Sequence, residues 1–174
     1  MIDLLVKVIL AYLLGSVSGS MVLGALRHVD IRKSGSGNAG DTNAFRTQGF
    51  WFALGVVVID IGKGALAAWF IPRLAIVALG APLSLEFQVL ACGFAAVVGH
   101  CYPIWYGFRG GKGAATAVGV LAVIEPFVLL PMIATWVLVL VLTGWVGLAT
   151  MLAACGLIPL FIWLDASPQL LWFG

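Results

Sequence analysis

The chain has 174 residues, of which 63% are hydrophobic and only 9% charged, and its formal net charge is +2. Its mean hydropathy is +1.14. Soluble domains carry about 25% charged residues, so this composition excludes an ordinary soluble protein and predicts an integral membrane protein. The small net charge provides no basic stripe of the kind that binds nucleic acid.

The apolar segments predict an all-α polytopic membrane protein, a helical bundle with about six spans. In chain order they cover residues 3–26, 50–72, 85–105, 113–125, 127–142 and 145–164. The first three approach the ~20 residues that a helix needs to cross the hydrocarbon core. We expect these spans and their short loops to form a single transmembrane domain over residues 1–174.

The loop after the first span is polar and reads KSGSGNAGDTNAFR over residues 33–46. Glycines in such a loop allow backbone N–H groups to converge on an anion, and an arginine supplies a planar fork for phosphate or carboxylate. We therefore predict a phosphate site, with a flexible Gly/Ser linker as the alternative. The residues predicted to line it are Gly35, Ser36, Gly37, Asn38, Gly40, Thr42, Asn43 and Arg46.

Ionisable residues also occur inside the second and third spans. Asp60 and Lys63 are three residues apart, so they share a helix face and can form an ion pair that supports the bundle or joins the substrate site. His100 lies near the end of the third span. It is either a general base or a histidine that hydrogen-bonds the backbone near Pro103.

The loop after the third span reads GFRGGKGAAT over residues 107–116. Its glycines, its lysine and the positive end of the helix that follows predict a phosphate cradle, with a tight packing turn as the alternative. The stretch does not fit the Walker A pattern, which requires Ser or Thr after the lysine. The residues predicted to line this cradle are Gly110, Gly111, Lys112, Gly113 and Thr116.

The fourth apolar segment, residues 113–125, is short. Thirteen residues make a helix of about 20 Å, which is less than the ~30 Å of the hydrocarbon core. We therefore expect this helix to start below the cytoplasmic surface, with its first turn in a recessed polar pocket. Helix starts of this kind bind anions in membrane proteins.

The positive charges cluster in the loops that follow the first and third spans. They are Arg27, Arg32, Lys33, Arg46, Arg109 and Lys112. Two spans separate these loops, so both lie on one side, and the positive-inside rule places them in the cytoplasm and the N-terminus outside. The two histidines and three cysteines have no metal-ligand spacing, so we predict neither a metal site nor a cofactor.

Four stretches resemble one known family: YLLGS, DIRKSGSGNAGDTNAFR, DIGKG and GHCYPIWYGFRGGKGAAT, between Tyr12 and Thr116. They resemble the bacterial membrane glycerol-3-phosphate acyltransferases that use acyl phosphate. The resemblance implies acyl transfer from acyl phosphate to the 1-hydroxyl of sn-glycerol 3-phosphate, which yields lysophosphatidic acid and phosphate as the first acylation of phospholipid synthesis. It also implies that Ser36, Arg46 and Lys112 are catalytic.

The same resemblance implies a seven-helix bundle in the bacterial inner membrane, with the active site facing the cytoplasm. It implies acyl phosphate, glycerol 3-phosphate and the lipid bilayer as partners of a monomer. The donor's own phosphate has been proposed to take the hydroxyl proton in this family, and His100 is the other candidate. A seventh helix and a third motif with His and Asn are expected beyond Gly174, and the seventh helix would begin near the stretch PQLLWFG.

One function of a different class is left open by the residues alone. The recessed start of the fourth helix also suits a transporter or channel for a small phosphorylated anion. Against this alternative, both polar motifs lie on one side of the membrane and no inverted repeat is evident.

Overall fold

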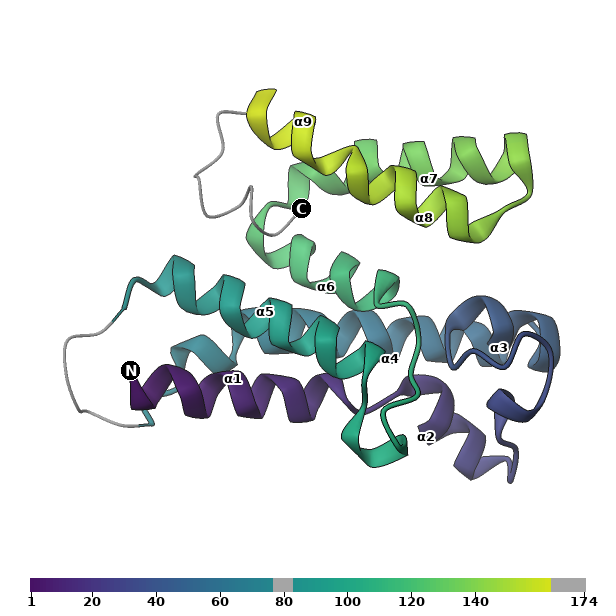
Figure 1. The fold of residues 1–174 in the computed structure, drawn as a ribbon, viewed down its shortest axis with the longest axis horizontal. Coiled ribbons are helices and arrows are strands. Elements are labelled where there is room, and N and C mark those ends of the chain that lie inside the picture. The colour runs from purple at the N-terminus through teal and green to yellow at the C-terminus, as the bar shows by residue number, and fades with distance from the viewer. Residues whose placement is uncertain (77–82, 164–174) are drawn as a thin grey trace. The chain divides into compact units, whose positions relative to one another are not determined.

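The computed structural model describes residues 1–76 and 83–163, and every regular element in this part of the chain is a helix (Figure 1). The predicted all-α fold is therefore confirmed. The chain divides into two compact units, Met1–Val123 and Ile124–Gly174. The single domain expected over residues 1–174 stays a prediction, and the stretch PQLLWFG lies outside the described residues.

The first unit contains six α-helices and three short 3₁₀ helices among its described residues. They are α1 (Ile2–Gly15), α2 (Gly19–Leu26), η1 (Ile31–Lys33), α3 (Asp41–Gln48), α4 (Phe50–Trp69), η2 (Ile71–Arg73), α5 (Leu85–Cys101), η3 (Ile104–Tyr106) and α6 (Ala114–Ile124). The described part of the second unit contains η4 (Pro126–Val128), α7 (Leu129–Thr143), α8 (Val146–Cys155) and α9 (Leu157–Trp163).

The first predicted span, residues 3–26, is not one straight helix. It consists of α1 and α2, which meet at an angle of 45°. The helix ends at Gly15, where the Ser16 side chain donates to Tyr12 O at 2.8 Å, and it restarts at Gly19. Small residues with competing hydroxyl groups weaken the helix here, because serine side chains bond to the backbone and glycine has poor helix propensity.

Small residues bring the helices of the first unit into backbone contact. A Cβ added to Gly15 would lie 2.1 Å from Ala96 O, and one on Gly99 would lie 2.3 Å from Tyr12 O. These contacts join α1 and α5, which run side by side in Figure 1. Between α6 and α4, a Cβ on Gly119 of α6 would lie 2.0 Å from Ile61 O of α4. Close approach of this kind is the usual basis of helix packing in membranes.

A buried cation joins the N-terminal half of α1 to neighbouring elements. The Lys7 ammonium, 5% exposed, lies 2.7 Å from Asp3 Oδ2 and donates to Pro72 O at 2.9 Å and to Gln88 Oε1 at 2.8 Å. One lysine therefore joins α1, η2 and α5. A charge inside a membrane protein needs partners, and these partners of Lys7 all belong to the protein, so this lysine stabilises the packing of the helices.

The helices of the second unit carry apolar side chains over most of their surface. The stretch Pro126–Thr143 has a mean hydropathy of 2.3 and only 6% of it is buried. Between α7 and α8, Gly144 adopts a φ of 70°, and Trp136 Nε1 donates to Thr150 Oγ1 at 3.2 Å. An exposed apolar surface of this extent suits a lipid environment.

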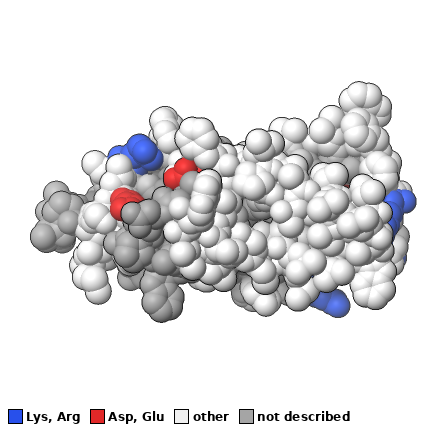
Figure 2. Space-filling model, turned by 90° about the horizontal axis from the view of Figure 1, so that it is seen from above, with Lys and Arg blue, Asp and Glu red and all other residues white. Residues whose placement is uncertain are grey.

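Four described helical stretches are long and apolar enough to cross a membrane, or five if the bent pair α1–α2 is one span. The α6 helix has 11 residues, so it is as short as predicted. Each of the six predicted apolar segments coincides with helix, although the last one extends one residue past the described range. Figure 2 shows a face on which charged side chains form only small separate patches.

Candidate functional site

The amide of Asn43, on α3, organises the first polar loop. Its Oδ1 accepts from Ser36 N at 2.9 Å, and its Nδ2 donates to the carbonyls of Ile31, Ser34 and Asn38 at 2.9–3.1 Å. The side chain is only 2% exposed, and both of its amide hydrogens are used within the loop. Asn43, predicted to bind phosphate, is instead placed to hold the loop in shape.

The glycines of this loop shape the backbone rather than opening a nest of free N–H groups. Gly35 and Gly37 have φ values of +61° and +72°, which side-chain-bearing residues rarely adopt. Gly37 N donates to Ser34 O at 3.2 Å, and Gly40 N donates to Asn38 Oδ1 at 2.8 Å. Several backbone N–H groups expected to bind an anion therefore donate to acceptors within the loop instead.

The groups left on the surface of the first loop are side chains. Ser36 and Arg46 are exposed, and Thr42, in the first turn of α3, is partly exposed. Arg46 lies in the last turn of the same helix. The Asn43 amide fixes the backbone under Ser36, so a hydroxyl and a guanidinium are presented from an ordered loop.

The second polar loop folds back onto the end of α5. Gly110 N donates to Cys101 O and Gly111 N donates to His100 O, both at 3.2 Å. A Cβ on Gly110 would lie 1.9 Å from His100 O, and one on Gly111 would lie 2.2 Å from His100 Nε2. Both glycines are therefore required by close packing, and their amides are not available for the predicted phosphate cradle.

The anion-binding groups that remain in this region are the Lys112 side chain and the start of α6. Lys112 is exposed, and Gly113 turns the chain with a φ of +81°. The first helical hydrogen bond of α6 runs from Ala117 N to Gly113 O, so the amides of residues 114–116 precede the helical ladder. A cation next to the positive end of a helix is a favourable place for phosphate.

Thr116 does not belong to this surface. Its side chain is fully buried, and a Cβ on Gly64 of α4 would lie 2.2 Å from Thr116 O. The residue therefore lies at the crossing of α4 and α6. The prediction that Thr116 contacts phosphate is not supported by this position.

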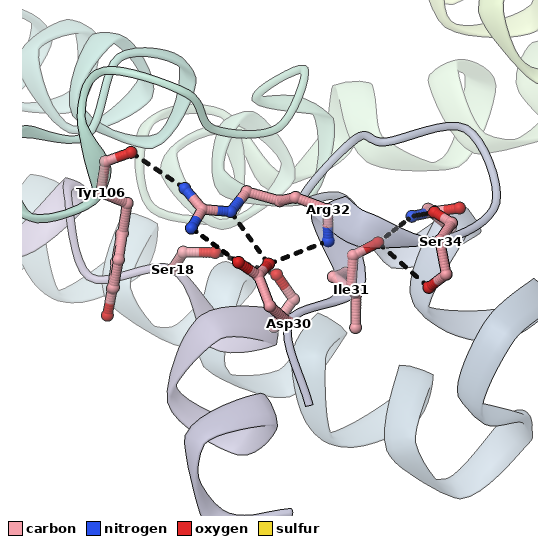
Figure 3. Close-up of polar contacts among 8 residues, drawn as sticks. Ser18, Asp30, Ile31, Arg32, Ser34 and Tyr106 are labelled. Carbon is pink, nitrogen blue, oxygen red and sulfur yellow. Dashed lines mark hydrogen bonds and ion pairs between the residues drawn. The ribbon is translucent and has the colours of Figure 1, made fainter. Parts of the chain in front are cut away.

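Arg32 joins the segments that precede the two polar loops, and Figure 3 shows its guanidinium between Asp30 and Tyr106. Its Nε and Nη2 donate to the Asp30 carboxylate at 3.0 and 2.9 Å, and its Nη1 donates to Tyr106 O at 3.0 Å. We call this arrangement the Arg32 strap. The Arg32 hydrogen bonds hold the pKa of Asp30 below its ordinary value. From the sequence Arg32 is expected only as one of the loop charges, although the Asp-x-Arg spacing is a signal for this local pair.

Asp60, Lys63 and His100 form a buried cluster at the break in the first span. The predicted ion pair is present, with Lys63 Nζ 2.8 Å from Asp60 Oδ1. Lys63 Nζ also lies 2.7 Å from Val17 O and 2.9 Å from His100 Nδ1, while Gly19 N donates to Asp60 Oδ1 at 3.1 Å. The cluster therefore supplies hydrogen bonds that the broken helix lacks.

These apolar helices and ordered polar loops define a multi-pass helical membrane protein. The chain belongs to the glycerol-3-phosphate acyltransferase family, whose sequence model matches residues 5–173. This match confirms the resemblance drawn from the sequence motifs and places the chain in a family of enzymes.

Named relatives agree with this assignment. A Symbiobacterium thermophilum protein named glycerol-3-phosphate acyltransferase is 45% identical over 134 residues, which are 77% of this chain and 63% of that protein. A Chlorobaculum parvum protein of the same name is 42% identical over 168 residues, covering 93% of this chain and 71% of that protein. The chain therefore matches less than two thirds of the Symbiobacterium protein. Because these relatives are acyltransferases, the transporter alternative is not favoured.

Two solved structures have the same fold. Both are crystal structures of PlsY (YgiH), an integral membrane glycerol 3-phosphate acyltransferase, one in a glycerol 3-phosphate form and one in a lysophosphatidic acid form. The first has a TM-score of 0.82 at 31% identity and covers 98% of this chain and 82% of its own. The second has a TM-score of 0.81 at 32% identity and covers 98% and 81%.

Proposed function

We propose that this protein transfers a fatty acyl group from acyl phosphate to the 1-hydroxyl of sn-glycerol 3-phosphate, releasing lysophosphatidic acid and phosphate. The Arg32 strap is the observation that carries the proposal. It tethers the segment before the loop that presents Ser36 and Arg46 to the segment that leads into Lys112. Two exposed cations from separate loops suit a reaction whose two substrates both carry a phosphate group.

The proposed roles follow from the chemistry of each group. Arg46 offers a planar fork that binds phosphate through two hydrogen bonds, and Lys112 offers a compact charge beside the start of α6. Ser36 orients the acyl phosphate with its hydroxyl group. Because the donor already has a good leaving group, much of the catalysis is positioning of the two reactants and stabilisation of developing negative charge.

The bond changes balance without a cofactor. The 1-hydroxyl oxygen forms a bond to the acyl carbonyl carbon, and the bond between that carbon and the phosphate oxygen breaks. The electron pair of the broken bond leaves with the phosphate. In this proposal the hydroxyl proton also passes to the departing phosphate.

The activity is tested with the chain reconstituted in liposomes, supplied with a long-chain acyl phosphate and labelled glycerol 3-phosphate. We expect equal amounts of lysophosphatidic acid and phosphate. If labelled glycerol 3-phosphate accumulates inside the liposomes while no lysophosphatidic acid forms, the enzyme proposal is wrong. Acyl-CoA in place of acyl phosphate is the donor control, and it should give no product.

We also propose that the protein lies in the bacterial inner membrane as a monomer, with its N-terminus outside and both polar loops in the cytoplasm. The cationic loops support this orientation through the positive-inside rule. In a variant whose native Cys92, Cys101 and Cys155 are replaced by alanine, a cysteine introduced at Lys33, which is exposed, should react with an impermeant thiol reagent only after the cells are opened. Labelling of this cysteine in intact cells would show that the polar loops lie outside, and the proposed orientation would then be wrong.

A further inference from the structure

The Asp60–Lys63–His100 cluster determines where the proton of His100 lies. A lysine ammonium has three N–H groups and no acceptor. Lys63 Nζ has three acceptors around it, Val17 O at 2.7 Å, Asp60 Oδ1 at 2.8 Å and His100 Nδ1 at 2.9 Å. The charge on Lys63 is balanced by Asp60, so each N–H has one acceptor and the Nδ1 of His100 accepts.

A ring nitrogen that accepts a hydrogen bond carries no proton, so in neutral imidazole the other nitrogen carries it. The proton of His100 is thus on Nε2. This nitrogen faces the backbone of the glycine loop, because a Cβ added to Gly111 would lie 2.2 Å from it. The side chain is only 1% exposed. The charged groups that act on it are Lys63 and Asp60 on α4 and Asp41 at the start of α3.

We propose that His100 is a positioning residue rather than a general base: its ring is neutral, with the proton on Nε2, and it packs against Gly111 in the glycine loop that leads to Lys112. One ring nitrogen is occupied by the Lys63 ammonium and the other already carries a proton, so neither can take the proton of the substrate hydroxyl. The role of His100 in turnover rests on the proposed function, whereas the position of its proton does not.

The proton position can be measured directly. The chain has two histidines, so the His28→Asn variant leaves His100 as the sole histidine. Asparagine suits this position because His28 has a φ of 56° and asparagine tolerates the left-handed region. In ¹⁵N,¹³C-histidine spectra of the full chain in lipid at neutral pH, we expect the protonated nitrogen to correlate with Cδ2. A proton on Nδ1, or on both nitrogens, would overturn the proposal.

Two substitutions separate the roles of the ring nitrogens in turnover. His100→Asn keeps an acceptor near the place of Nδ1, and His100→Gln keeps a donor near the place of Nε2. Neither side chain takes up a proton at neutral pH. Loss of a neutral hydrogen bond at Nε2 costs roughly 3- to 10-fold, and loss of the bond between the Lys63 ammonium and Nδ1 costs about 10- to 100-fold. General-base catalysis contributes about 10²- to 10⁴-fold, and both variants would lose it.

We therefore expect at least one of the two variants to keep kcat within about tenfold of the wild type, with an unchanged pH profile. A loss confined to one variant supports positioning through the nitrogen that it lacks. A loss of more than about 100-fold in kcat in both, with the acidic limb of the profile removed and wild-type unfolding midpoints, would overturn the proposal. If the wild type makes no product, the proposed function fails and the spectra still decide the position of the proton.

Discussion

At the scale of single residues, the first polar loop contains buried side chains that stabilise it and exposed side chains that can bind a ligand. Asn43 is buried and spends its amide on the loop, whereas Ser36 and Arg46 are exposed. In the second loop, Lys112 is exposed while the glycines before it pack against α5. The side chains that can meet a ligand are therefore few, and each is presented by a loop with internal hydrogen bonds.

Arg46→Ala and Lys112→Ala should each lower kcat/KM for acyl transfer by roughly 100- to 1,000-fold, because each removes a cation that stabilises phosphate and developing charge. Lys33→Ala is the matched control, since it removes an exposed cation from the same first loop. We expect it to stay within about threefold of the wild type. Equal losses in all three variants, measured by lysophosphatidic acid formation in liposomes, would point to general surface charge instead.

Asn43→Asp should destabilise the first loop by about 1–3 kcal/mol, because a carboxylate cannot donate to the three carbonyls that now share Nδ2. Asn38→Asp is the control for stability. Its Oδ1 only accepts from Gly40 N at 2.8 Å, which a carboxylate also does. Unfolding midpoints in detergent measure both variants, and an unchanged midpoint for Asn43→Asp would contradict the role assigned to this amide.

At the scale of elements, glycines determine how closely α4 approaches its neighbours. Gly64 faces α6 with no room for a side chain, since a Cβ there would meet Thr116 O at 2.2 Å. Gly62 lies on the same helix, and a Cβ there would meet nothing within 4 Å. The start of α6, and with it Lys112, is therefore held in place by one face of α4.

Gly64→Ala should lower the stability of the protein by about 1–3 kcal/mol, because the added methyl group meets backbone rather than a flexible side chain. Gly62→Ala, on the open face of the same helix, should leave the unfolding midpoint unchanged or slightly higher, because alanine has the better helix propensity. The comparison uses thermal unfolding in the same detergent. Similar midpoints for the two variants would mean that α4 and α6 do not pack this closely.

At the scale of the whole molecule, the chain combines apolar helices with a few polar ties. Within the first unit, Lys7 and Lys63 each join several helices through buried hydrogen bonds, and Arg32 ties the segments that precede the two polar loops. The second unit has no charged residue between positions 126 and 163. Its described helices present mainly apolar surface, so the polar chemistry belongs to the first unit.

The Arg32 strap should contribute to stability at neutral pH and lose this contribution in acid. Arg32 lowers the pKa of Asp30 in the folded state, so the contribution is full above the ordinary aspartate value of 3.8 and is lost as the pH falls through the lower folded value. Wild type and Asp30→Asn should therefore differ in unfolding midpoint at neutral pH and converge below 3.8. A difference that stays constant over this range would contradict the strap.

Much of this fold follows from hydrophobicity and residue spacing, because apolar runs near the thickness of a bilayer have few alternatives to helix. The ion pair of Asp60 and Lys63 also followed from helical spacing. Residue spacing does not predict which side chains of a polar loop are buried and which are exposed. Asn43 and Thr116 have buried side chains, and Gly110 and Gly111 pack closely against His100, because which face of a loop is covered depends on contacts with distant helices.

The break between α1 and α2 also bears on how the chain is assembled in the membrane. Val17 O and Gly19 N obtain their partners from α4, a helix that is synthesised later. Unpaired backbone groups in hydrocarbon cost several kcal/mol each, so the bend is unfavourable until α4 has been inserted. We expect the nascent first segment to enter the bilayer as a continuous helix and to acquire its bend only when the second hydrophobic segment docks beside it.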